Sequence, residues 1–141
     1  MEGVMEGVLA NFLEEWEEDD MGVHSLFVSL HDHLQGMAGR ELSFKGRPGI
    51  SYSLRAKHPN QQKRDLFVLV DVIDDEPEER WLSICFYADS LLPEQIAVGD
   101  VVPGGLGGED ACCFDVGEAE EDTEVFMKAC LDAAWAFAAK A

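Results

Sequence analysis

Residues 50–88 read ISYSLRAKHPNQQKRDLFVLVDVIDDEPEERWLSICFYA, and this stretch decides the fold class. Apolar and polar residues alternate over residues 50–57, which is typical of a strand with one buried face. Residues 66–73 and 81–88 are apolar on both faces, as the central strands of a sheet are. Because the polar segments between these strands are short enough for hairpins, we expect an antiparallel sheet.

The sequence on either side of this stretch completes an α+β pattern. Further strands are expected at residues 42–45 and 111–116, so the sheet should have four to five strands. Apolar residues at helical spacing predict two N-terminal helices and one C-terminal helix, over residues 2–18, from 23 to Gly36 or Gly39, and over 121–139. We therefore expect residues 1–141 to form a single domain in which an antiparallel sheet is packed by these helices.

The composition excludes some classes of partner. The net charge is −19, which argues against direct binding of nucleic acid, because phosphates require an excess of Lys and Arg. No apolar run approaches the length that spans a bilayer, so we expect no membrane association. Glu2 and Glu6 stand where an export signal would need basic and apolar residues, and we therefore expect a cytoplasmic protein.

The charge is unevenly distributed along the chain. Residues 40–64 hold seven of the ten bases and a single acid, whereas the segments on both sides are strongly acidic. Two interpretations compete: the basic segment forms a cationic rim for an anionic ligand, or it neutralises the acidic elements beside it. We favour neutralisation at this stage.

The polar face of the strand at residues 50–57 supplies the candidate binding site. Hydroxyl groups and cations alternate along that face, and a hairpin neighbour could place an aromatic side chain on the same side of the sheet. Such a face could bind a small anionic or planar ligand. The alternative is an ordinary solvated surface. The candidate ligand-binding residues are Ser51, Ser53, Arg55, Lys57, Trp81 and Tyr87.

Cysteines and histidines give no recognised catalytic or metal-binding motif. Cys85, Cys112, Cys113 and Cys130 lie in apolar segments without metal-ligand spacing, so we expect buried, reduced thiols, with Cys113 the more accessible of the adjacent pair. The only histidine cluster has ligand spacing unlike that of zinc sites, and we predict no metal or other cofactor. That cluster consists of His24, His31, Asp32 and His33.

Two features leave structural alternatives open. The glycine-rich residues 103–108 lack a basic phosphate-binding residue, so we expect a flexible loop or lid there. The C-terminal helix is apolar nearly all round, with one stripe at Phe126, Cys130, Ala133 and Phe137 and a second at Leu131, Ala134, Trp135 and Ala138. A homodimer through this helix and a monomer that wedges it between layers fit the pattern equally well.

The function predicted from sequence is a non-enzymatic binding or regulatory module for a protein partner or a small anionic ligand. Two alternatives remain. An enzyme could assemble its site from distant segments, and an acidic mimic of nucleic acid could bind a basic protein. The residues available for an enzyme are Arg55, His58, Tyr87 and Cys113.

Overall fold

The structure is a computed structural model that describes residues 2–16 and 21–140, with the backbone alone described for residues 2–6. The helices are α1 (Glu2–Glu15), α2 (Val23–Gln35), α3 (Pro93–Ile96) and α4 (Glu121–Ala138), and a 3-10 turn η1 (Ala88–Ser90) precedes α3. The strands are β1 (Glu41–Arg47), β2 (Ser51–Lys57), β3 (Val68–Ile73), β4 (Trp81–Tyr87), β5 (Asp100–Leu106) and β6 (Glu109–Val116). The predicted α+β class is confirmed.

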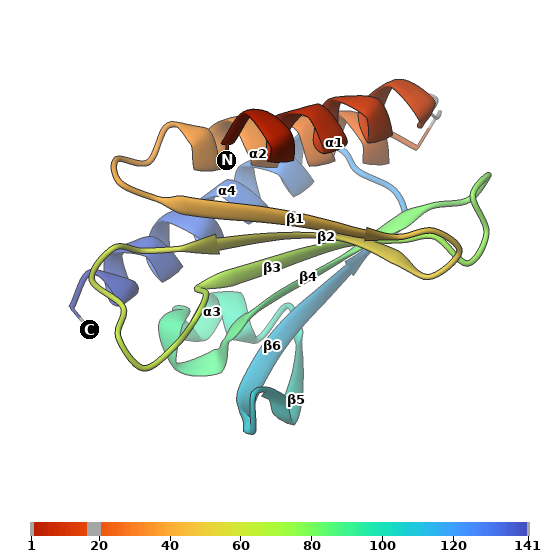
Figure 1. Ribbon diagram of the computed structural model, residues 1–141. Helices are drawn as coiled ribbons and strands as arrows, with labels where there is room; N and C mark the ends of the chain where they lie inside the picture. Colours follow the sequence, from red (N-terminus) through yellow and green to blue (C-terminus); the bar gives the residue numbers. More distant parts are fainter. Residues whose placement is uncertain (1, 17–20, 141) are drawn as a thin grey trace.

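All six strands form one antiparallel sheet in the order β1-β2-β3-β4-β6-β5 (Figure 1). The two strands that are apolar on both faces, β3 and β4, occupy the centre of this order, as predicted. The turn between β1 and β2 places Pro48 before Gly49, and Gly49 has a φ of 84°, a conformation that glycine adopts without steric cost.

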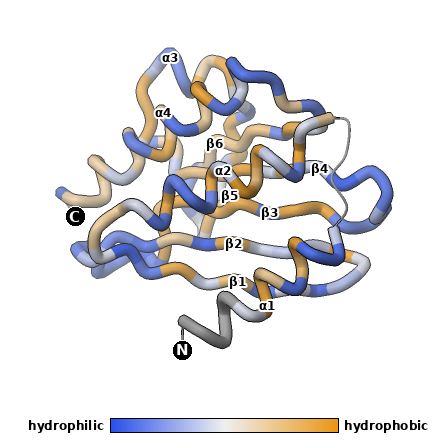
Figure 2. The backbone as a smooth tube through the Cα atoms, turned by 90° about the horizontal axis from the view of Figure 1, so that it is seen from above, coloured by the Kyte–Doolittle hydropathy of each residue, from blue (hydrophilic) through white to orange (hydrophobic). Residues whose placement is uncertain are grey.

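Helices α1, α2 and α4 cover one face of the sheet and leave the other without a helix, although a small second cluster of buried apolar residues lies on that other face at the end of β4: Leu66, Tyr87, Leu106 and Ala111. Figure 1 shows α1 and α2 above the strands, with α4 beside them, and Figure 2 shows the three helices side by side from above. Their apolar residues and the inward residues of the strands form one core, whose largest fully buried members are Phe27, Phe67, Phe86, Leu30, Leu34, Leu54, Leu82, Ile84, Met127, Leu131, Val23 and Val68. We call the uncovered side the open face.

An aromatic cluster joins α1, α2 and the first hairpin. The ring of Tyr52 stacks on that of Phe12 with centroids 3.9 Å apart, and Phe27 meets Phe12 edge-on at 6.3 Å. Gly46 makes this arrangement possible, because a Cβ there would come within 2.7 Å of the Tyr52 ring. Residues 17 and 18 of the predicted first helix lie outside the described residues.

The prediction of a loop or lid at residues 103–108 is wrong. This segment continues β5, an edge strand that pairs with β6 and turns back at Gly107 and Gly108. Pro103 is tolerated because an edge strand leaves one row of backbone groups unpaired in the sheet, and the register shifts between Val102 and Leu106. The sheet therefore has six strands, whereas four to five were predicted.

The packing of α4 corrects the predicted stripes. Within the first stripe Cys130 is buried but Phe137 is 40% exposed, whereas Leu131, Ala134 and Ala138 of the second stripe are buried. One side of α4 packs on the sheet and another contacts α2 of the same chain. That two copies of the chain form a homodimer through α4 stays a prediction.

The cysteines divide into two pairs with different surroundings. Cys85 and Cys113 lie directly opposite each other on β4 and β6 and form a disulfide, so the prediction of reduced thiols is wrong for these two. Sequence spacing could not indicate this bond, because the register of two non-consecutive strands brings the residues together. Cys112 and Cys130 are free and buried, as predicted.

Alkylation of the folded protein should distinguish the two pairs. Burial raises the pKa of Cys130 to about 12 and also raises the pKa of Cys112. Since only the thiolate reacts, roughly one in ten thousand Cys130 side chains would be reactive at pH 8. We expect iodoacetamide to label no cysteine before reduction or unfolding, and mass spectrometry of peptides to find Cys85 and Cys113 linked. Rapid labelling of Cys130 in the folded protein, or of Cys85 without reduction, would contradict this arrangement.

Candidate functional site

The six predicted site residues come from two strands whose side chains alternate between the core and the open face. In β2, Leu54 and Ala56 are buried in the core, so the odd-numbered residues from Ser51 to Lys57 belong to the other face. In β4, Leu82, Ile84 and Phe86 point into the core, which assigns Trp81 and Tyr87 to the open face as well. The structure therefore brings all six onto one face of the sheet, but at different places along it.

The first hairpin carries a concentrated set of cations on the open face. The register pairs Arg47 with Ser51, Lys45 with Ser53 and Ser43 with Arg55, so directly opposite residues share this side. Glu41, opposite Lys57, is the single acid among the outward residues of these two strands. We define the basic face as Lys45, Arg47, Arg55 and Lys57.

The structure divides the basic segment between the two interpretations, because Arg64 pairs with Asp89 and Glu109 whereas the cations of the hairpin do not pair locally. None of the four side chains of the basic face makes an ion pair with any residue in the described part of the chain. Lys45, Arg47 and Arg55 are exposed, and Lys57 is half-buried. Successive side chains of a strand point to opposite faces of the sheet. The cations therefore point away from the acidic helices, because their neighbours along each strand pack beneath α1 and α2. They are therefore available to an external anion.

The two serines and Trp81 border the basic face. Ser51 is buried and accepts a hydrogen bond of 3.4 Å from Nη2 of Arg47, while Ser53 donates its hydroxyl to Asp71 on β3. Trp81 lies half-buried opposite Ile73, which in turn lies opposite Ser51. The positive charge is limited to the hairpin, because the same face carries Asp71 on β3 and Asp115 further across the sheet on β6.

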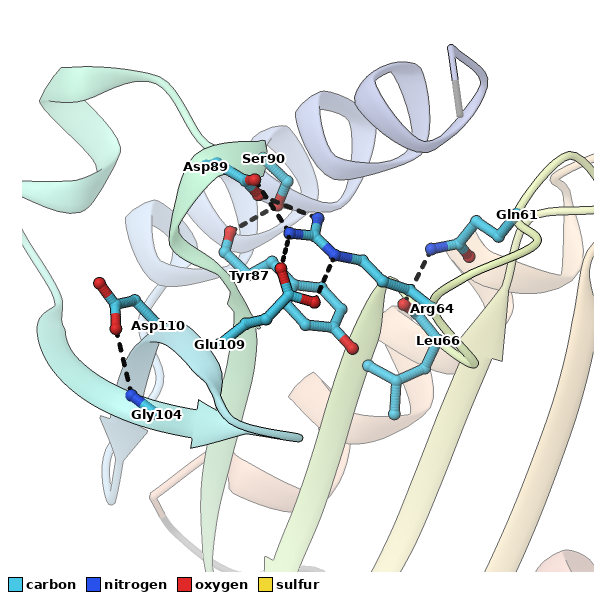
Figure 3. A network of polar contacts seen from close by, with 9 residues as sticks. All are labelled: Gln61, Arg64, Leu66, Tyr87, Asp89, Ser90, Gly104, Glu109 and Asp110. Atoms are coloured by element: carbon cyan, nitrogen blue, oxygen red, sulfur yellow. Dashed lines mark hydrogen bonds and ion pairs between the residues drawn. The ribbon is translucent and has the colours of Figure 1, made fainter.

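Tyr87 belongs to a separate polar network at the other end of β4. The guanidinium of Arg64 lies 3.9 Å from the centre of its ring and hydrogen-bonds to Asp89 and Glu109 on either side (Figure 3). Burial raises the pKa of Tyr87, although the positive charge of Arg64 partly opposes the shift. The ring of Tyr87 thus contacts Arg64, and its joint action with the basic face stays a prediction.

Arg64 links three segments that are distant in sequence. Four hydrogen bonds of 2.7–3.1 Å connect it to the carboxylates of Asp89, in η1, and Glu109, at the start of β6. Those carboxylates raise the pKa of Arg64, and Arg64 holds the pKa of Glu109 below its usual value. The loop after β2 is therefore fixed to the end of the sheet.

The residues considered for an enzyme do not assemble into one site. Cys113 is committed to the disulfide with Cys85, and two strands separate it from Arg55. The buried His58 ring packs on Trp135 with centroids 4.1 Å apart, and its Nδ1 accepts a hydrogen bond from the amide of Asn60.

The histidine cluster on α2 is spread among different neighbours. Nε2 of His33 lies 2.7 Å from Asp132, whereas Nε2 of His24 lies 3.3 Å from the carbonyl oxygen of Leu13. His31 and Asp32 contact each other at 3.3 Å. Within the described residues, no group of three or more His, Cys, Asp or Glu side chains could hold a metal ion.

Sequence reasoning missed Lys45 and Arg47 as site residues. The predicted strand stopped at Lys45, although Leu42, Phe44 and Gly46 alternate with polar residues through Arg47. Extending the predicted strand by two residues, to Arg47, would have placed both cations on the same face as Arg55 and Lys57. No such signal exists for the Arg64 network, because its three members come together only through tertiary structure.

Comparisons with protein-family models, with curated proteins and with solved structures found no match for this chain. Among the described residues, no helix has both the length and the apolar character that crossing a membrane would require.

Proposed function

We propose that this chain is a non-enzymatic binding module that uses its basic face to bind an acidic segment of a partner protein. The observation that carries the proposal is the set of four cations on adjacent strands that make no ion pair with any described residue, in a chain of net charge −19. Like charges held together repel one another, so an anion bound between them is favoured.

The geometry of the hairpin suits an extended segment. Directly opposite residues of two antiparallel strands lie about 5 Å apart, so the cations form a short grid along β1 and β2. Arg47 and Arg55 can each bind a carboxylate through two parallel hydrogen bonds, and Ser43 adds a hydroxyl directly opposite Arg55. Half-buried Trp81 and Ile73 provide an apolar border for side chains between the acidic residues.

The surrounding charge favours a short acidic peptide over a long polyanion. Asp71 on β3 and Asp115 on the more distant β6 would repel an anion that extended across the sheet. The bound segment should therefore follow the hairpin, and its affinity should fall as salt screens the exposed charges.

The test is binding of a short fluorescent oligo-glutamate peptide, followed by fluorescence anisotropy at low and at physiological salt. We expect the double substitution Arg55→Glu and Lys57→Glu to weaken binding about tenfold or more, since each reversed charge replaces an attraction with a repulsion and tenfold equals about 1.4 kcal/mol. Arg55→Ala alone should produce a smaller loss in the same direction.

The matched control is Lys63→Glu with Lys140→Glu, which changes the net charge equally at exposed positions away from the basic face. We expect this control to bind the peptide nearly as well as the unmodified chain, and oligo-glutamine to bind neither. Equal losses in both double variants would reduce the effect to overall charge and overturn the proposal, as would an absence of binding at low salt.

A further inference from the structure

A cavity of about 530 Å³ lies at the end of the sheet opposite the first hairpin turn, between the loop after β2, η1 and the C-terminal part of α4. Apolar side chains line its interior: Phe67 and Ala134 are fully buried, and Ala138 nearly so. Phe137 lies at its edge and is 40% exposed. The volume is within the range of roughly 300–1,000 Å³ that is typical of small-molecule sites.

Hydrogen bonds fix the walls of this cavity. The side chain of buried Gln61 accepts a hydrogen bond of 2.9 Å from the amide of His58 and donates one to the carbonyl of Leu66. Asn60 donates from Nδ2 to the carbonyl of Ala139, which attaches the loop to the end of α4. Ser90 donates to the carbonyl of Tyr87. A preformed cavity costs little ordering entropy on binding.

The rim has an excess of positive charge. Its two carboxylates, Asp89 and Glu109, are both hydrogen-bonded to Arg64 (Figure 3). Lys63 and Lys140 are exposed and make no ion pair with any described residue. With three cations and two carboxylates lining it, the cavity carries a net charge of +1 in a strongly acidic protein.

We infer that this cavity binds a small amphipathic carboxylate, with an aliphatic or aromatic body against the exposed ring of Phe137 and its single negative charge between Lys63 and Lys140. The apolar interior disfavours a highly charged metabolite. A cationic ligand is also disfavoured, because Asp89 and Glu109 are already hydrogen-bonded to Arg64. This site is separate from the basic face, so the inference stands independently of the proposed function.

The experiment compares phenylbutyrate with phenylbutanol, which shares its body but lacks the charge, by isothermal titration calorimetry or ligand-observed NMR on the full chain. We expect Lys63→Ala with Lys140→Ala to weaken phenylbutyrate binding by about fivefold to tenfold and to leave phenylbutanol binding unchanged. Phe137→Ala should weaken both ligands, because it removes an apolar contact that both share.

The control is Arg55→Ala with Lys57→Ala, which changes the net charge by the same amount as the lysine double variant and should leave phenylbutyrate binding intact. Loss of binding in that variant would place the carboxylate on the basic face and overturn the inference about the cavity. An absence of phenylbutyrate binding, or equal binding by the unmodified chain and the lysine double variant, would also overturn it. None of these results depends on whether the basic face binds an acidic peptide.

Discussion

Replacing Arg80 with alanine should lower the free energy of unfolding by about 3–5 kcal/mol, because it leaves a buried carboxylate without its partner. The side chains of Arg80 and Asp74 are 3% and 4% exposed, and Nε of Arg80 donates to Asp74 at 2.7 Å. Arg80 also contacts Glu15 of α1 at 3.1 Å and lies over the rings of Phe12, Trp16 and Tyr52. Its loss should loosen α1 from the sheet as well.

Urea unfolding measures this effect, and a second variant separates its causes. Burial opposes ionisation of Arg80, yet the hydrogen bonds to Asp74 and Glu15 raise its pKa above the ordinary value, so the charge persists. Arg80→Ala combined with Asp74→Asn should recover part of the lost stability, because the uncompensated buried charge is then absent. Asp74 also accepts a hydrogen bond from the amide of Gly49, which an asparagine oxygen can retain. A loss below about 1 kcal/mol in Arg80→Ala would show that the pair is not buried as described.

Phe27→Ala should cost a similar amount, about 3–5 kcal/mol, through the loss of apolar burial and the cavity that remains. Phe27 is fully buried, and its ring contacts those of Phe12, Trp16 and Phe44 at centroid distances of 5.9–6.4 Å. It therefore holds α1, α2 and β1 together at the centre of the aromatic cluster.

Denaturant unfolding followed by circular dichroism tests this prediction, and two control variants set its scale. Phe27→Leu retains much of the volume and should cost less than about half as much as alanine. Val125→Ala changes a residue that is 64% exposed on α4 and should stay within about 0.5 kcal/mol of the unmodified chain. Equal effects of Phe27→Ala and Val125→Ala would be incompatible with a core centred on Phe27.

Local patterns predicted the elements that bury a continuous face, because burial and periodicity are directly related. The alternation in residues 50–57 and the apolar runs of β3 and β4 predicted the centre of the sheet, and helical spacing predicted α1, α2 and α4. The strand β5 was missed because its residues are mostly exposed and rich in glycine, so pairing with β6 determines its structure and its own side chains do not.

Contacts between distant segments could not be predicted. Arg80 has no local signal that distinguishes it from a surface arginine, and only the fold brings Asp74 and Glu15 to it. The same holds for Cys85 with Cys113. The candidate site was partly predictable, because one strand determined the orientation of Ser51, Ser53, Arg55 and Lys57, but Tyr87 was grouped with them without knowledge of Arg64.

The most direct test of the central claim is to map the binding of the oligo-glutamate peptide onto the chain by two-dimensional amide NMR. We expect chemical-shift changes concentrated in Glu41–Arg47 and Ser51–Lys57. They should decrease toward β4, become smaller with added salt, and be largely absent in the Arg55→Glu, Lys57→Glu variant. Shifts centred instead on the cavity beside α4, or distributed evenly over the surface, would contradict the assignment of binding to the basic face.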